Sequence, residues 1–142
     1  MPELELVEVT SGLRFPEGPI AMADGSVLVV EMFGPRITRV APDGAKTTVA
    51  EIAGGPNGMA LGPDGAIYLC NNGGTFSPLE IGDWLVPGPF DAGRYIGGRI
   101  QRVDIATGVV TDLYTECDGR PLRGPNDIVF DADGGMWFTD HG

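Results

Sequence analysis

The stretch Phe15-Pro16-Glu17-Gly18-Pro19 recurs twice in altered form, as Gly55-Pro56-Asn57-Gly58 and as Gly124-Pro125-Asn126-Asp127. In each copy, a proline precedes a side chain that carries an oxygen acceptor. An Asp-Gly pair begins eight residues after each proline, and a second polar side chain stands fourteen residues after each acceptor. Three copies in one frame indicate an internal repeat.

Each copy has the pattern of a β-hairpin. Apolar residues flank the pairs Asp24-Gly25, Asp64-Gly65 and Asp133-Gly134, and apolar runs divided by such a turn are the strongest short-range signal for a hairpin. Four antiparallel strands in a repeat of about 40 residues are typical of a β-propeller blade. The third and fourth strands of the first two repeats are expected at 36–40, 47–50, 99–103 and 109–114.

The repeat predicts an all-β incomplete propeller domain over residues 1–142. Blade one is expected at about 15–52, blade two at about 55–116, and the start of blade three at about 124–142. Propellers close with roughly four to eight blades, so about two and a half blades do not make a closed ring. We therefore expect the remaining blades to come from a second chain or a missing continuation. The alternative is a small self-contained β-sandwich.

Blade two contains an insertion at about 75–97. Forty-two residues separate Asn57 from Arg99, whereas 19 separate Glu17 from Arg36, which leaves 23 extra residues. A long loop in a compact domain is usually functional. We expect it either to cover one end of the channel or to form an outer hairpin that packs its aromatic residues on a blade. A shorter insertion at about 117–123 precedes blade three, and the alternating residues 1–14 predict an N-terminal strand.

Composition limits the partners. The net charge is −11, from 20 acidic and 9 basic residues, which argues against nucleic acid and anionic membranes. No apolar run approaches the roughly 20 residues of a membrane span, and the first residues lack the pattern of a signal peptide. Cys70 and Cys117 lack metal-binding spacing, and we expect them to be reduced in a cytoplasmic protein.

The repeated acceptors predict a shared site. The innermost strand of every propeller blade lines the central channel, so Glu17, Asn57 and Asn126 are expected to converge there from neighbouring blades. A carboxylate and two carboxamide oxygens suit a hard cation such as Ca²⁺, which takes six to eight oxygen ligands. The alternative for Asn57, which precedes Gly58, is a turn residue that tolerates unusual backbone angles.

The three motifs, together with Trp137-Phe138-Thr139-Asp140, resemble the senescence-marker-protein/gluconolactonase (regucalcin-like) family. The resemblance covers essentially the whole chain but only the first part of the family's length. It implies a six-bladed β-propeller, of which this chain supplies roughly the first two and a half blades. It also implies a calcium-dependent lactonase, with Zn²⁺, Fe²⁺ or Mn²⁺ as other candidate ions.

The resemblance assigns roles to individual residues. It implies that Glu17 and Asn126 bind the metal and that Asn126 also contacts substrate, and we place Asn57 with Asn126 in substrate binding. The family's further Asn ligand and its metal-bound Asp have no counterpart here, so residues 1–142 alone are expected to be inactive. Asp127 and His141 are weaker candidates for acid–base work, because Asp127 can bond local backbone amides and His141 can simply face solvent.

The implied function is metal-dependent hydrolysis of a sugar-acid lactone or similar cyclic ester. One alternative is a phosphotriesterase-like or broad esterase activity at the same metal. Another is a non-catalytic binding module, because propellers host many unrelated functions.

Overall fold

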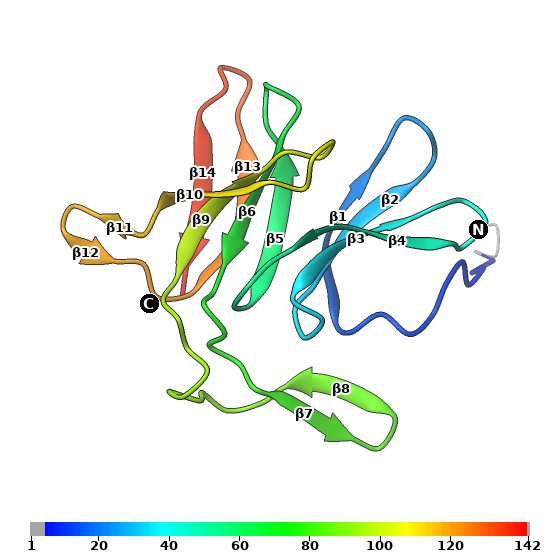
Figure 1. Ribbon diagram of the computed structural model, residues 1–142, viewed down its shortest axis with the longest axis horizontal. Helices are drawn as coiled ribbons and strands as arrows, with labels where there is room; N and C mark the ends of the chain where they lie inside the picture. The colour runs from blue at the N-terminus through cyan, green and yellow to red at the C-terminus, as the bar shows by residue number, and fades with distance from the viewer. Residues whose placement is uncertain (1–4, 142) are drawn as a thin grey trace.

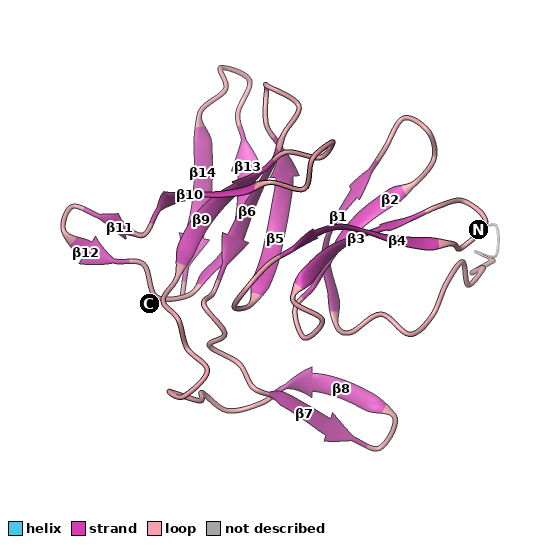
Figure 2. Cartoon of the chain, in the orientation of Figure 1, coloured by secondary structure: helices cyan, strands magenta, loops and turns pink. Residues whose placement is uncertain are grey.

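The computed structural model describes residues 5–141, and within that range the regular structure consists of β-strands without helices (Figure 1, Figure 2). Accordingly, the described residues include no helix that could cross a membrane. The all-β prediction is confirmed. No sheet closes on itself in the described part of the chain, and the total of six blades stays a prediction.

The first repeat forms a four-stranded antiparallel sheet in the order β1-β2-β3-β4. Its first hairpin closes as the Asp-Gly signal predicts, because the Asp24 carboxylate accepts the backbone N–H of Ser26 at 3.0 Å and its hydroxyl at 2.6 Å. The third strand spans the predicted residues. The strands are β1 (Pro16–Ala21), β2 (Val27–Glu31), β3 (Arg36–Val40) and β4 (Lys46–Glu51).

The second repeat forms an equivalent sheet in the order β5-β6-β9-β10, and its insertion forms a separate two-stranded hairpin, β7-β8. Figure 1 shows this hairpin projecting away from the sheet that contains it. The strands of the sheet are β5 (Pro56–Leu61), β6 (Ile67–Asn71), β9 (Arg99–Val103) and β10 (Val110–Tyr114). Those of the insertion are β7 (Pro78–Ile81) and β8 (Trp84–Pro87).

The third repeat contributes one hairpin, in which β13 (Pro125–Phe130) pairs with β14 (Met136–Asp140). The shorter insertion before it forms a small hairpin of β11 (Glu116–Cys117) and β12 (Arg120–Pro121). The innermost strands lie next to one another, because β5 packs against both β1 and β13.

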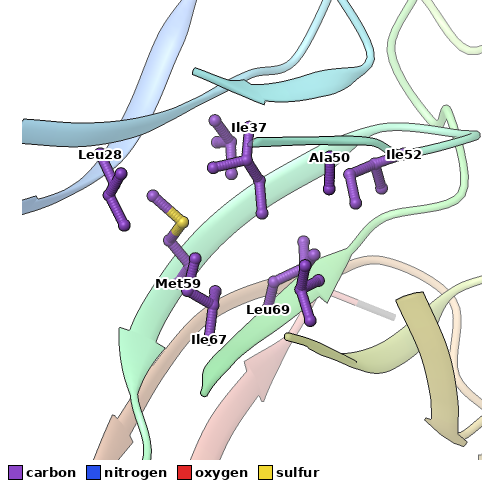
Figure 3. Packing of buried hydrophobic residues seen from close by; sticks show 9 residues of the cluster. Leu28, Ile37, Ala50, Ile52, Met59, Ile67 and Leu69 are labelled. Atoms are coloured by element: carbon purple, nitrogen blue, oxygen red, sulfur yellow. The ribbon is translucent and has the colours of Figure 1, made fainter. Parts of the chain in front are cut away.

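The two sheets bury a shared apolar core between them (Figure 3). Leu28 and Ile37 of the first sheet and Ile67 and Leu69 of the second are fully buried. A second cluster, which includes Cys70, joins the second sheet to the β13–β14 hairpin. Each sheet therefore packs its apolar faces against its neighbours, as stacked propeller blades require.

The predicted N-terminal strand does not form in the described part of residues 1–14. Residues 5–13 have no regular structure, and residues 1–4 of the predicted segment lie outside the described residues. Leu6 and Val7 are 95% and 74% exposed. A strand needs a hydrogen-bonded neighbour, and no strand in residues 5–141 pairs with this segment. The Thr10 hydroxyl instead donates to the Gly44 carbonyl at 3.1 Å.

The second polar position of each repeat anchors the loop that enters the first strand. The side chains of Glu31, Asn71 and Asp140 each accept a backbone N–H from the residues just before the repeated proline. The donors are Arg14 to Glu31 at 2.8 Å, Gly55 to Asn71 at 3.0 Å, and Gly124 to Asp140 at 2.6 Å. These side chains are structural, and they fix where each motif begins.

Candidate active site

The three repeated motifs each contain a β-bulge at the same place. Strand pairing shifts register between Glu17 and Ile20 in β1, between Pro56 and Met59 in β5, and between Pro125 and Ile128 in β13. A bulge bends a strand and re-aims its side chains. The oxygen-bearing residue of every motif lies at this irregularity.

The bulges face one cavity of about 470 Å³. Glu17, Asn57, Asn126 and Asp127 all line it, so the structure brings together the acceptors of three hairpins that are far apart in sequence. The other lining residues are Phe15, Gly18, Pro19, Met32, Gly58, Met59, Phe76 and Pro87.

Two glycines allow the hairpins to approach this closely. A Cβ atom on Gly18 would lie 2.7 Å from the backbone nitrogen of Met59, and one on Gly58 would lie 2.3 Å from Oδ1 of Asp127. Gly18 also has a φ of +51°, which side chains rarely adopt. The glycine after each of the first two acceptors thus admits the next hairpin.

A hydrogen bond joins two of the candidate residues. Nδ2 of Asn57 donates to Oδ1 of Asn126 at 2.9 Å, and Asn57 is only 7% exposed. The bond fixes the Asn126 carboxamide, and because a carbonyl oxygen has two lone pairs, one remains for a ligand. Asn57 therefore orients Asn126 as well as lining the cavity.

Glu17 and Asp127 differ in their surroundings. Glu17 is half-buried, and no group within residues 5–141 hydrogen-bonds to its carboxylate. Asp127 is exposed, and its Oδ1 accepts the backbone N–H of Ile128 at 2.9 Å. This is the local backbone bond that the sequence suggested for Asp127. Glu17 is thus the cavity carboxylate whose acceptor sites carry no hydrogen bond within residues 5–141, whereas Asp127 uses part of its own.

His141 lies elsewhere. It lines a different cavity with Thr75 and Tyr95, and the structure does not bring it together with Glu17 or Asn126.

The inserted hairpin reaches the candidate site. Two residues at the base of the hairpin form part of the cavity wall: Phe76, which precedes β7, and Pro87, the last residue of β8. The base of the insertion therefore borders the cavity, and a cover over one end of the channel stays a prediction. The sequence did not predict Phe76 or Pro87 as site residues, because neither has a counterpart in the other repeats. The position of the insertion was the signal that could have pointed to them.

The side chains in the cavity fit part of a metal site. Within residues 5–141, no group of three or more His, Cys, Asp or Glu side chains could hold a metal ion. The cavity instead offers the carboxylates of Glu17 and Asp127 and the carboxamides of Asn57 and Asn126, all oxygen donors of the kind that Ca²⁺ prefers. The set is chemically suited to a hard cation but too small to complete its coordination.

The sequence of the chain matches a known protein family. Residues 15–142, which include all three motifs, match the profile of the SMP-30/Gluconolactonase/LRE-like region. The chain belongs to this family. The resemblance read from the motifs is thereby confirmed.

Individual members of the SMP-30/gluconolactonase family agree with the match. The chain is 26% identical over 149 residues to a gluconolactonase of Zymomonas mobilis, covering 93% of this chain and 35% of that protein. A gluconolactonase structure from Xanthomonas campestris superimposes with a TM-score of 0.67 at 23% identity, covering 90% of this chain and 35% of the other. The chain thus spans about a third of the length of these relatives.

The fold is shared more widely than the family. Virginiamycin B lyase from Staphylococcus aureus, in a structure with quinupristin, superimposes with a TM-score of 0.59 at 19% identity, covering 89% of this chain and 35% of that one. At such identities a structural likeness shows the fold alone.

Proposed function

We propose that this chain supplies part of the divalent-metal site of a lactone hydrolase built on a six-bladed propeller. The observation that carries the proposal is the convergence of Glu17, Asn57 and Asn126, from three hairpins, on one cavity. Membership of a family with gluconolactonase relatives favours a sugar-acid lactone or similar cyclic ester as the substrate.

Glu17 and Asn126 are the metal ligands in this proposal. Ca²⁺ is the expected ion, ahead of Zn²⁺, Fe²⁺ and Mn²⁺, because the donors are all oxygen. A bound divalent cation supplies polarisation of the lactone carbonyl. Since Ca²⁺ takes six to eight oxygens, the remaining ligands come from outside residues 5–141, in a second chain or a continuation.

The other cavity residues bind and orient the substrate. Asn57 holds the Asn126 carboxamide through the 2.9 Å bond, and in the proposal both amides, which line the cavity, contact substrate oxygens. Phe76 and Pro87 reduce access of water to one side of the cavity. The general base is expected in the missing blades, so residues 1–142 alone are inactive. The two free thiols, Cys70 and Cys117, fit a cytoplasmic location, which is part of the proposal.

Metal binding can be tested on the chain itself. Titration calorimetry with CaCl₂ is expected to show binding that Glu17→Gln weakens at least about tenfold, because the substitution removes the negatively charged donor. Glu116→Gln, which removes an exposed carboxylate outside the cavity, should bind as the unaltered chain does. Equal affinity in Glu17→Gln and the unaltered chain would contradict the assignment.

The reaction is tested in a protein with the complete set of blades. Hydrolysis of glucono-δ-lactone is expected there, with loss of activity after chelation by EDTA and in Glu17→Gln. Hydrolysis that survives both changes would rule out the metal mechanism. A preference for a phosphotriester would favour the second enzymatic alternative, and calcium binding without any hydrolysis would favour a binding module.

A further inference from the structure

A second cavity of about 440 Å³ shares no lining residue with the candidate active site. It forms where the segment leading from β8 to β9 passes the end of β14, close to the C-terminus (Figure 1). Phe90 and Tyr95 from the insertion line it together with Arg123 and His141. Its volume lies within the range of small-molecule sites.

The aromatic wall of this cavity is built in advance. Phe90 and Tyr95 meet edge to face, with ring centroids 5.5 Å apart and an interplanar angle of 65°. The Tyr95 hydroxyl donates to the Arg123 carbonyl at 2.8 Å and accepts the Gly98 N–H at 3.2 Å. These bonds hold Tyr95 in place, while Phe90 stays 59% exposed and can stack on a ligand ring.

Arg123 also lines the cavity. Four other arginines form salt bridges, whereas the Arg123 guanidinium forms no hydrogen bond or ion pair within residues 5–141. The acids nearest to the cavity in sequence accept backbone N–H groups: Asp140 from Arg123 and Gly124, and Asp91 from Gly93. A guanidinium beside aromatic rings suits a planar anion.

We propose that this cavity binds a small aromatic carboxylate. The ligand ring packs against Phe90 and Tyr95, and its carboxylate pairs with Arg123, with His141 as a second polar contact. The two cavities are lined by different residues, so ligand binding at each can be tested with its own variants.

Binding of 2-naphthoate, measured by titration calorimetry, tests the proposal. The neutral isostere 2-naphthamide should bind at least tenfold more weakly, because it cannot form an ion pair. Arg123→Gln should lower 2-naphthoate affinity at least tenfold, and Arg94→Gln should not change it. Arg94 belongs to the same insertion, is exposed and lines neither cavity, so this control removes an equal charge.

Two further variants keep the test decisive. Phe90→Ala alters a side chain that is largely exposed, and it should also weaken 2-naphthoate binding. Glu17→Gln should leave that binding unchanged, which separates this proposal from the proposed metal site. Equal binding of 2-naphthoate and 2-naphthamide, or affinity insensitive to both Arg123→Gln and Phe90→Ala, would overturn the assignment. So would an absence of 2-naphthoate binding at millimolar concentration.

Discussion

The Glu31 carboxylate is the charged group most completely enclosed by the first sheet, with 1% of its surface exposed. Arg36, Thr38 and the backbone N–H of Arg14 donate to it at 2.8, 2.6 and 2.8 Å. Burial by itself acts to raise the pKa of Glu31, but these hydrogen bonds outweigh it and lower the pKa from 4.5 to about 2. The ionised form therefore stabilises the fold.

This shift predicts a pH dependence of stability. A depressed pKa contributes stability that is fully present above the ordinary value of 4.5 and is lost as the pH falls toward about 2. Glu31→Gln should lower the free energy of unfolding at pH 7 by about 2–3 kcal/mol, and the deficit should shrink between pH 4.5 and 3. Urea unfolding across this range measures it. Glu116→Gln serves as the exposed control, and a deficit in Glu31→Gln that does not vary with pH would refute the role.

Asn71 occupies the same position in the second sheet and uses its whole carboxamide. Its Oδ1 accepts the N–H groups of Gly55 and Gly73, and its Nδ2 donates to the Ala53 carbonyl and to Gln101 Oε1. The adjacent Asn72 is also buried, but its Nδ2 has no partner while its Oδ1 accepts two N–H groups.

Asn71 and Asn72 are expected to differ in how well they tolerate substitution by aspartate. Asn71→Asp turns two donated bonds into contacts between a buried carboxylate and two acceptors, and should destabilise the fold by about 3–5 kcal/mol. Asn72→Asp keeps both accepted bonds and removes an unpaired donor. Its loss of unfolding free energy should therefore be at least about 2 kcal/mol smaller than that of Asn71→Asp. Urea unfolding at pH 7 compares them. Similar losses would show that the bonds of Nδ2 do not decide the outcome.

The repeat in the sequence identified Glu31, Asn71 and Asp140 as equivalent positions, but it did not reveal their structural role. Each accepts at least one backbone amide, such as that of Arg14 or Gly55, whose position depends on strand register. Side chains that point into a shared cavity and side chains that anchor a loop look alike in sequence. The structure separates the two sets.

At the level of strands, the glycine after each of the first two acceptors sets the spacing between hairpins. Gly18 lies against the backbone of β5, and Gly58 lies against Asn126 and Asp127 of β13. In the third motif Asp127 stands at the equivalent position. Close contact of the bulges is what brings Asn57 within hydrogen-bonding distance of Asn126.

Gly58→Ala is predicted to separate β5 from β13. The new Cβ would lie 2.3 Å from Asp127 Oδ1 and 2.7 Å from the Asn126 carbonyl oxygen, so β13 must move. The expected loss is about 1–3 kcal/mol in unfolding free energy, with weaker calcium binding as the cavity opens. Gly124→Ala, where the nearest atom would be 3.7 Å away, is the matched control. Equal stability of the two variants would contradict this packing.

Individual strands were predictable where a local signal and a partner coincide. Residues 36–40 and 99–103 form strands as expected, because each lies between two predicted neighbours. Residues 5–13 also alternate, yet they form no strand, since alternation does not supply a partner. Phe76 and Pro87 of the cavity wall have no counterpart in the other repeats, so the repeat frame could not identify them and only the position of the insertion pointed to that region.

For the molecule as a whole, the central claim is that three repeated hairpins direct their acceptor side chains at one ion. The most direct measurement is a crystal structure of the chain grown with TbCl₃, a luminescent and anomalously scattering substitute for Ca²⁺. The account predicts an anomalous peak in the cavity between β1, β5 and β13, bonded to oxygens of both Glu17 and Asn126. A terbium ion bound elsewhere, with no ion shared by Glu17 and Asn126, would contradict it.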